Sequence, residues 1–393
     1  MIYQRFGRTG LRMPLLSAGF MRCMQSWRDG PDQEIDQRSQ DILAAVVHRA
    51  LDLGITHLET ARGYGTSERQ LGRVLTGLQR HDFIIQTKVG PEDDPERFSA
   101  NVLDSLARLR LDRLDLLTIH GINDFRSLWQ VCRPGGCLAA ARRLQRQGLV
   151  DWVGFSGHGS TEVILAAVGH RQDEGFDYVN LHWYTIFQCH TPVLKEAQAG
   201  DMGVFIISPT DKGGMLQKPP DRLRRLSSPL SPMQFNDLFC LTRPEIHTIS
   251  VGASVPGDFS EHVAALDTLE RPDLVLEIYH RWQQAMQDAT GGAEPWYPWS
   301  VFRPWEQTPG YINIPMVLWL DNLARGWDLL EYARQRYAKL GRDMPWVRGN
   351  SAADSRRYDL SAVAAGANME TRELESRLQA AHRLLSGTGS GGS

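Results

Sequence analysis

The chain is poor in cysteine, and it lacks long apolar runs and any strong excess of charge of one sign. Its five cysteines are an odd number without zinc-type spacing, which indicates a reducing compartment, so we expect a cytoplasmic protein. No apolar run reaches the length of a membrane span, and the start lacks the layout of a secretion signal. The formal net charge of -3 gives no electrostatic reason to expect a nucleic acid or a membrane as partner.

Two short segments are set aside before the fold is considered. Cys132 and Cys137 flank a Pro-Gly-Gly loop, and we interpret them as free thiols, because a low thiolate pKa needs a positive neighbour that sequence cannot demonstrate. The last residues, SGTGSGGS at 386–393, form a low-complexity segment that we expect to be a flexible tail.

Eight short apolar runs alternate with amphipathic segments over most of the chain, a pattern typical of repeated βα units. The pattern predicts an α/β protein with a (β/α)8 TIM barrel over residues 1–270, with an open doubly wound sheet as the alternative. We also expect an N-terminal β-hairpin in YQRFGRTGLRMP and a long loop over 213–232. The expected strands are LLSAGF from Leu15, HLET from His57, FIIQTK from Phe83, LDLLTIH from Leu114, VDWVGFSG from Val150, DYVNLHW from Asp177, MGVFIIS from Met202 and EIHTISVG from Glu245.

The composition changes after the barrel, and residues 271–385 are expected to form a smaller helical domain. Six of the 11 tryptophans lie between Trp296 and Trp346. Aromatic packing within this domain explains their density, and direct contact with a substrate is the alternative.

Four side chains suited to proton transfer come near the ends of three consecutive strands. Glu59, Lys88 and His120 stand at strand ends, and Tyr64 follows the first of these strands. Because barrel active sites are built at the carboxyl ends of strands, we expect these four candidate catalytic residues to converge. A lysine ammonium lowers the pKa of a neighbouring phenol, which makes Tyr64 a plausible acid, with Glu59 orienting Lys88.

The blocks around these residues, GITHLETARGYGTSERQLGRVL, IIQTKVG and LLTIHGI, resemble those of the aldo-keto reductases. The resemblance continues in order through VGFSGHGS, YVNLHWY, VFIISPTDKGGML and HTISVGASVPGDFSEHV, over about two thirds of the chain. It implies that Tyr64 is the proton donor in the NAD(P)H-dependent reduction of an aldehyde or ketone. Glu59 stands where this family normally has aspartate, so an ion pair without a catalytic role is the alternative for Glu59.

The same resemblance implies a nicotinamide cofactor site. The resemblance to the family favours NADPH as the cofactor. NADH is the alternative, because Ile207 replaces an aromatic ring that would stack on the nicotinamide, and Ala253 and Asp258 replace basic residues that would bind the 2'-phosphate. Arg222, Arg224 and Arg225 could supply the missing positive charge. Ser156 and Asn180 would hold the nicotinamide carboxamide, Ser208, Thr210 and Lys212 would reach the pyrophosphate, and Gly252, Ala253 and Ser254 would receive the adenosine phosphate.

The final segment resembles the C-terminal module of aldo-keto reductases that carry a ferredoxin-like pair of iron-sulfur clusters. Thiolates hold such clusters, so we expect no iron-sulfur cluster and no other metal; a helical cap unrelated to ferredoxins is the alternative. The positions that would bear the ligands are Pro298, Val301, Pro304, Thr308, Ser355, Tyr358, Ser361 and Ala365, and none is cysteine.

Two functions remain open from the sequence. The first is an enzyme that acts on a small-molecule carbonyl substrate through Tyr64, Lys88 and His120. The second is a regulatory protein that binds a nicotinamide nucleotide as a redox sensor and contacts a protein partner, or a second copy of itself, through its C-terminal domain.

Overall fold

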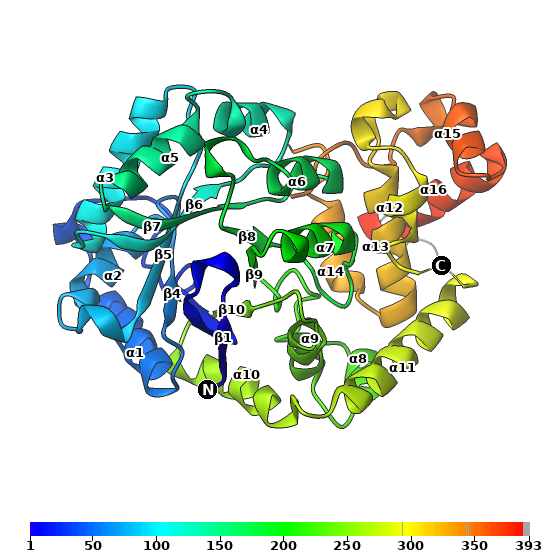
Figure 1. Cartoon of the computed structure of the whole chain (residues 1–393). Helices are drawn as coiled ribbons and strands as arrows, with labels where there is room; N and C mark the ends of the chain where they lie inside the picture. The colour runs from blue at the N-terminus through cyan, green and yellow to red at the C-terminus, as the bar shows by residue number, and fades with distance from the viewer. Residues whose placement is uncertain (293, 343, 345, 388–393) are drawn as a thin grey trace. The chain divides into compact units, whose positions relative to one another are not determined.

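Eight parallel strands form a closed barrel in the protein, whose structure is a computed structural model (Figure 1). Each strand pairs with its two neighbours in the order β10-β3-β4-β5-β6-β7-β8-β9, so the predicted (β/α)8 barrel is confirmed and the open sheet is wrong. The strands are β3 (Leu16–Gly19), β4 (His57–Glu59), β5 (Ile84–Val89), β6 (Leu114–His120), β7 (Val150–Ser156), β8 (Tyr178–Leu181), β9 (Gly203–Ile206) and β10 (Thr248–Gly252).

The structure describes residues 1–292, 294–342, 344 and 346–387, so most of the expected tail, 388–393, lies outside the described residues. The chain divides into two compact units. The first comprises Met1–Trp183, His190–Thr210 and Asn236–Glu270. The second comprises Tyr184–Cys189, Asp211–Phe235 and Arg271–Ser393. The second unit therefore includes two segments that precede residue 270 in the chain.

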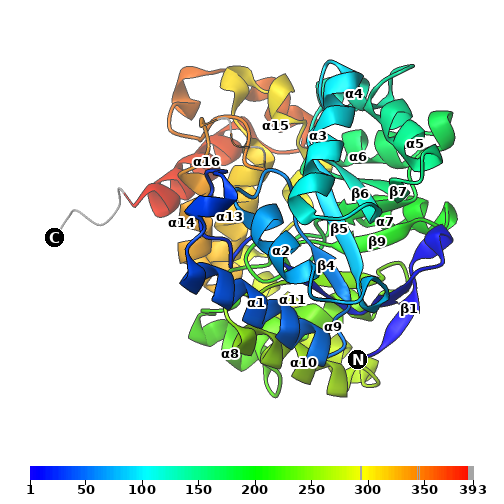
Figure 2. The same ribbon diagram turned by 90° about the vertical axis from the view of Figure 1, so that its left-hand side faces the viewer.

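Helices surround the strands of the first unit, and Figure 2 shows α1, α2 and α3 along one side of it. Aspartates begin three of these helices: Asp36, Asp94 and Asp124 each accept a hydrogen bond from a backbone amide of the first turn. The helices are α1 (Gln37–Asp52), α2 (Ser67–Leu75), α3 (Pro95–Leu109), α4 (Phe125–Cys132), α5 (Cys137–Arg146), α6 (Thr161–Val168), α7 (Thr191–Ala199) and α10 (Phe259–Ala265), and α9 (Pro232–Leu241) crosses the division between the units.

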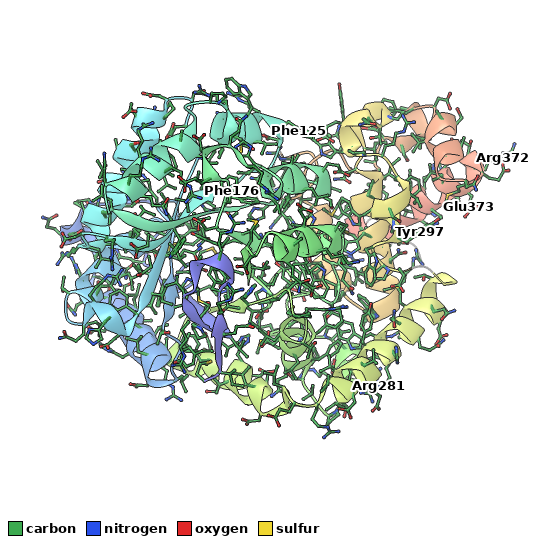
Figure 3. All side chains as sticks on the ribbon, in the orientation of Figure 1. Phe125, Phe176, Arg281, Tyr297, Arg372 and Glu373 are labelled. Atoms are coloured by element: carbon green, nitrogen blue, oxygen red, sulfur yellow. The ribbon has the colours of Figure 1, made fainter. Side chains whose placement is uncertain are left out.

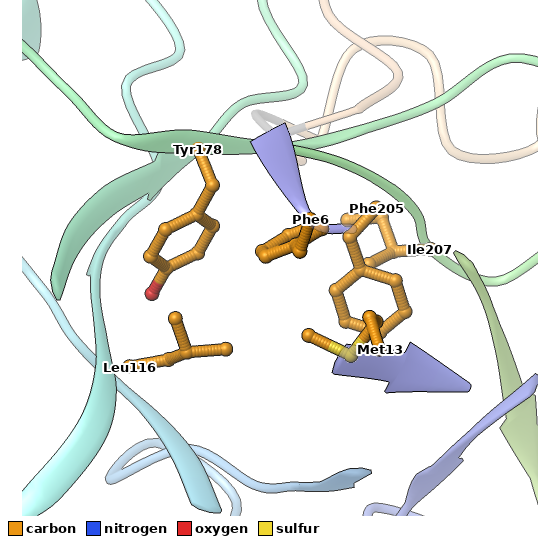
Figure 4. Close-up of a cluster of buried hydrophobic side chains, with 6 residues drawn as sticks. All are labelled: Phe6, Met13, Leu116, Tyr178, Phe205 and Ile207. Carbon is orange, nitrogen blue, oxygen red and sulfur yellow. The ribbon is translucent and has the colours of Figure 1, made fainter. Parts of the chain in front are cut away.

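The N-terminal hairpin is present as predicted, with β1 (Tyr3–Arg5) antiparallel to β2 (Arg12–Pro14). Phe6, which follows β1, and Met13, on β2, are fully buried and pack with Leu116, Tyr178, Phe205 and Ile207 of the barrel (Figure 4). This cluster is possible because Gly203 has no side chain: a β-carbon there would lie 2.7 Å from the Phe6 ring. The hairpin is thereby anchored to the barrel core.

A belt of hydrogen-bonded polar side chains lies inside the barrel, two to four residues before the strand ends. Ser17 Oγ lies 2.6 Å from His57 Nδ1 and 2.7 Å from Thr248 Oγ1. On neighbouring strands, Gln86 donates to Thr118 Oγ1 at 2.8 Å. All five side chains are fully buried. Since side chains alternate along a strand, the next inward-facing positions, including Glu59, Lys88 and His120, lie directly beyond this belt.

The second unit is helical, and aromatic rings form much of its interior. Trp282 and Trp327 lie 5.0 Å apart between ring centroids, and Trp319 lies 5.7 Å from Phe187 and 6.2 Å from Tyr332. Tyr297 and Arg281, labelled in Figure 3, belong to its helices. The helices are α8 (Asp221–Ser227), α11 (Pro272–Thr290), α12 (Tyr297–Val301), α13 (Ile314–Trp327), α14 (Leu330–Tyr337), α15 (Ser361–Gly366) and α16 (Thr371–Ser386).

The prediction of a loop over 213–232 is wrong in part, because α8 lies within it. Leu223 is fully buried on this helix. The several arginines around Leu223 make the segment look polar in the sequence, so its short apolar face was not predicted. None of the helices in the described part of the chain combines the length and apolar character needed to cross a membrane. Within the same residues, no group of three or more His, Cys, Asp or Glu side chains is placed to hold a metal ion.

Candidate active site

A buried ion pair stands at the carboxyl ends of β4 and β5. The ammonium group of Lys88 donates hydrogen bonds to the carboxylate of Glu59 and, at 2.9 Å, to the carbonyl oxygen of Thr60. Ser250 on β10 donates to the other carboxylate oxygen of Glu59 at 3.1 Å. Burial lowers the pKa of Lys88, but Glu59 and Tyr64 raise it more, so it lies above its ordinary value. Lys88 is therefore a fixed positive charge.

Tyr64 lies against this ion pair, in the connection between β4 and α2. Lys88 Nζ is 5.0 Å from the centroid of the Tyr64 ring, and the His120 ring meets that ring edge-on with centroids 6.0 Å apart. The structure thus brings Glu59, Tyr64, Lys88 and His120 together, as expected from their positions at the strand ends.

The acidity of Tyr64 differs from the expectation drawn from its neighbour Lys88. Burial raises the pKa of Tyr64, Lys88 lowers it and Glu59 raises it again, and the result lies above the ordinary value. Lys88 lowers the pKa as expected, but desolvation of the phenolate outweighs this attraction, so the net shift is upward.

Sequence patterns missed two further residues beside this group. Gly19 on β3 faces Glu59, and a β-carbon there would lie 2.7 Å from Glu59 Oε1. Trp27, in the connection between β3 and α1, is 66% exposed and meets the Tyr64 ring edge-on at 6.3 Å. A glycine at a strand end was the only sequence signal for the first, and nothing in the pattern pointed to Trp27.

Ser156 and Asn180 stand opposite each other at the ends of β7 and β8. Both side chains are buried, and Ser156 Oγ accepts a hydrogen bond from the amide of Gly121 at 3.1 Å. The amide nitrogen and oxygen of Asn180 have no hydrogen-bond partner among the described residues. Buried polar atoms are nearly always paired, so this amide points to a ligand that offers one donor and one acceptor. The carboxamide of a nicotinamide ring is such a group, and the residues fit it.

The turn after β10 is already occupied by a carboxylate of the chain itself. Asp258 accepts hydrogen bonds from the amides of Ser254 at 2.7 Å and Val255 at 3.2 Å. Asp258 thus engages the Ser254 amide, and the role of Gly252, Ala253 and Ser254 in receiving the adenosine phosphate stays a prediction. A different cation stands nearby: a β-carbon on Gly252 would lie 3.3 Å from Cδ and 3.4 Å from Nε of Arg22.

The segment after β9 passes from one unit to the other. Ser208 has a positive φ of 56°, and the carbonyl of Pro209 accepts a hydrogen bond from Asn236 at 3.2 Å. Thr210 is the last residue of one segment of the first unit, whereas Lys212 belongs to the second unit.

Lys212, Arg222 and Arg224 make contacts within the second unit. Lys212 Nζ lies 5.1 Å from the Trp346 ring centroid. Burial lowers the pKa of Lys212 to about 7, although Asp211 raises it. Arg222 donates to backbone carbonyls of Ala285 and Arg325. Arg224 donates to the carbonyl of Pro219 and lies 3.7 Å from Asp221.

The barrel with a tyrosine, a charged lysine and a histidine at its carboxyl rim defines a class of NAD(P)-dependent oxidoreductases that act on carbonyl compounds. Residues 16–272 match the sequence model of the Aldo/keto reductase family, and the chain belongs to this family.

Similar proteins and structures agree with this assignment. L-galactose dehydrogenase from Arabidopsis thaliana is 28% identical over 297 residues, which cover 67% of this chain and 88% of that protein. 6-dehydroglucose reductase from Novosphingobium aromaticivorans is 31% identical over 134 residues, which cover 30% of this chain and 41% of that protein. The holo form of the aldo-keto reductase AKR11C1 from Bacillus halodurans has a TM-score of 0.58 at 20% identity and covers 71% of this chain and 96% of its own. The last likeness is one of fold.

Proposed function

We propose that the protein reduces a small aldehyde or ketone to an alcohol, with Tyr64 as the proton donor. The observation that carries this proposal is the placement of a buried, charged Lys88 between the carboxylate of Glu59 and the ring of Tyr64. A permanent cation beside a phenol serves a reaction in which the phenol loses its proton, because the cation stabilises the phenolate that remains.

Each side chain has a distinct part in this reaction. A bound nicotinamide cofactor would supply the hydride that adds to the carbonyl carbon. The Tyr64 hydroxyl donates its proton to the carbonyl oxygen, and Lys88 stabilises the resulting phenolate. His120, edge-on to the Tyr64 ring, donates a hydrogen bond to the same oxygen and orients it. Glu59 keeps Lys88 charged and in place, so its role is positioning. The products are the alcohol and the oxidised cofactor.

We propose NADPH as the cofactor, with its carboxamide on Ser156 and Asn180. The unpartnered amide of Asn180, judged over the described residues, supports this assignment. Ser208, Thr210 and Lys212 remain the proposed contacts of the pyrophosphate. Arg22, beside Gly252, supplies positive charge for the adenosine phosphate in place of the arginines of α8.

The substrate is proposed to be a small carbonyl compound that binds at the hydroxyl of Tyr64, in a site that Trp27 borders. The exposed indole of Trp27 gives the site an apolar wall beside the proton donor. Two similar proteins are named for sugar compounds, L-galactose and 6-dehydroglucose, which supports including hydroxylated aldehydes among the candidates.

The decisive experiment follows oxidation of NADPH and NADH with methylglyoxal, glyceraldehyde and benzaldehyde, and oxidation of L-galactose in the reverse direction. Tyr64→Phe removes only the hydroxyl, so we expect a loss of kcat of at least about a hundredfold with an unchanged affinity for the nucleotide. Equal, slow turnover by both proteins together with tight nucleotide binding would instead identify a binding protein, as in the redox-sensor alternative.

A further inference from the structure

The connection between β3 and α1, residues 20–36, is attached to the segment that follows Tyr64. Ser26 exchanges hydrogen bonds with Thr66, from the Thr66 amide to the Ser26 carbonyl at 3.1 Å and from the Ser26 amide to Thr66 Oγ1 at 3.2 Å. The amide of Gln25 donates to Gln70 Oε1 at 2.9 Å. Gly65 has a φ of 46°, and a β-carbon there would overlap the carbonyl oxygen of Ser26. The connection therefore lies directly on the Tyr64 turn.

Two carboxylates of this connection bind arginines of two different helices. Asp29 pairs with Arg69 at 2.9 Å and with Arg108 at 2.8 Å. Asp32 pairs with Arg69 at 3.4 Å and with Arg110 at 2.7 Å. Arg69 belongs to α2, whereas Arg108 and Arg110 stand at the end of α3, and α2 packs against α3. We call Asp29, Asp32, Arg69, Arg108 and Arg110 the ionic latch.

The ionic latch is stronger than isolated surface pairs because its members share partners and are partly shielded. Arg108 is only 10% exposed and also pairs with Asp104 at 2.8 Å. Burial raises the pKa of Asp32, but Arg110 and Arg69 lower it more, so the carboxyl stays charged at neutral pH. Networks of this kind contribute more to stability than single exposed ion pairs do.

The ionic latch also reaches the strand that bears Lys88. Arg108 lies 3.9 Å from the buried carboxylate of Glu68, and Glu68 accepts a hydrogen bond from Thr87 at 2.6 Å. Thr87 precedes Lys88 on β5. The connection that carries Trp27 thus contacts two elements next to Tyr64. It bonds directly to the turn before α2, and it is linked to β5 through Arg108 and Glu68.

We propose that Asp29 and Asp32 are positioning residues that hold Trp27 edge-on to Tyr64 and so determine which carbonyl compounds fit beside the proton donor. The inference rests on the proposed function, in which Tyr64 protonates the substrate. A small substrate lies close to Tyr64 and does not need the indole, whereas a flat, extended substituent packs against it. The ionic latch therefore acts on selectivity and on KM more than on the chemical step.

The test compares benzaldehyde with methylglyoxal in Asp29→Asn, Asp32→Asn and the double variant. Neutral amides keep the shape but remove the ion pairs, so we expect the KM for benzaldehyde to rise about fivefold or more while kcat with methylglyoxal changes less than about twofold. Asp201→Asn is the matched control, because Asp201 pairs with Arg5 at 2.6 Å on the N-terminal hairpin. In Trp27→Ala the same latch substitutions should have no further effect on selectivity.

A second measurement needs no variant. Salt screens ion pairs, so raising the ionic strength from about 0.05 to about 0.5 M should raise the KM for benzaldehyde in the wild type more than in the double variant. Equal selectivity losses in Asp201→Asn, undiminished latch effects in Trp27→Ala, or equal salt effects in wild type and double variant would each overturn the inference. The proposed function is judged separately by Tyr64→Phe with methylglyoxal, which does not depend on the ionic latch.

Discussion

Gly19 and Glu59 share one corner of the barrel, where they are register partners on β3 and β4. A β-carbon on Gly19 would lie 2.7 Å from Glu59 Oε1 and 3.0 Å from Ser250 Oγ. The glutamate side chain is accommodated because its neighbour Gly19 has no side chain.

This pairing predicts that Gly19→Ala impairs the support of Lys88. The added methyl displaces the carboxylate, so kcat should fall about tenfold or more and the melting temperature should drop by several degrees. The double variant Gly19→Ala with Glu59→Asp should recover most of both losses, because the shorter acid leaves room for the methyl. Gly257→Ala is the control, since a β-carbon there meets nothing within 4 Å. No recovery in the double variant would contradict the pairing.

We predict that replacing Asn180 with leucine has opposite effects on stability and on cofactor binding. Its amide is buried and without a partner among the described residues, so Asn180→Leu removes an unsatisfied polar group and should leave the melting temperature unchanged or higher. The same variant loses the proposed carboxamide contact, and the Kd for NADPH should rise about tenfold or more. Calorimetric titration and thermal unfolding measure both quantities. A strong loss of stability would show that the amide is satisfied within the folded chain.

We predict that Arg22 determines the preference of the enzyme for NADPH over NADH. Arg22→Gln removes the charge beside Gly252, so the KM for NADPH should rise about tenfold while that for NADH changes less than about twofold. Arg28→Gln, on the same connection and likewise exposed, is the control. Equal losses for both cofactors would place Arg22 away from the phosphate that distinguishes them.

The pKa of Tyr64 predicts the pH dependence of reduction. Burial raises this pKa, and the opposing effect of Lys88 is smaller, so the phenol keeps its proton through neutral pH. The kcat/KM for reduction should stay level through neutral pH and fall only above the ordinary phenol pKa of about 10. In Lys88→Met the lowering effect disappears, so the decline should move to higher pH at a smaller overall rate. A decline near neutral pH would contradict a raised pKa.

His57, in the polar belt of the barrel, predicts loss of stability in acid. Burial lowers its pKa to about 3, whereas the unfolded chain has a histidine pKa near 6.5. The unfolded state therefore binds the proton more readily, so stability is retained above about pH 6.5 and lost below it, by about 1.4 kcal/mol per pH unit from this residue. Denaturant unfolding between about pH 4 and 7 measures the slope. His57→Gln should have a shallower slope than the wild type, and an unchanged slope would rule out His57 as the cause.

Much of the barrel and the grouping of its polar residues could be predicted from the sequence. The eight apolar runs became eight strands, because alternation of βα units is a local pattern that the chain repeats. Glu59, Lys88 and His120 lie together because parallel strands end at one rim, which makes strand-end residues neighbours whatever their separation in the sequence. These inferences needed only the order of the elements.

Other properties depended on contacts between distant residues, and no local pattern reveals those. Whether Tyr64 is more or less acidic depends on how far burial outweighs Lys88, and desolvation is a property of the packed protein. Asp258 binds the amides of Ser254 and Val255, and Lys212 belongs to the second unit with Trp346, because tertiary packing selected these partners.

The four residues at the barrel rim show most clearly which properties follow from the sequence and which from the tertiary structure. The sequence by itself determined that an acid, a tyrosine, a lysine and a histidine end up side by side, through element order and the shared direction of the strands. Only the tertiary structure decided how they interact: a glycine makes room for the glutamate, burial sets the pKa of the tyrosine, and an ion-paired connection brings Trp27 to its edge. The reason is physical, since secondary structure follows local periodicity, whereas electrostatics and fit follow the distances that packing creates.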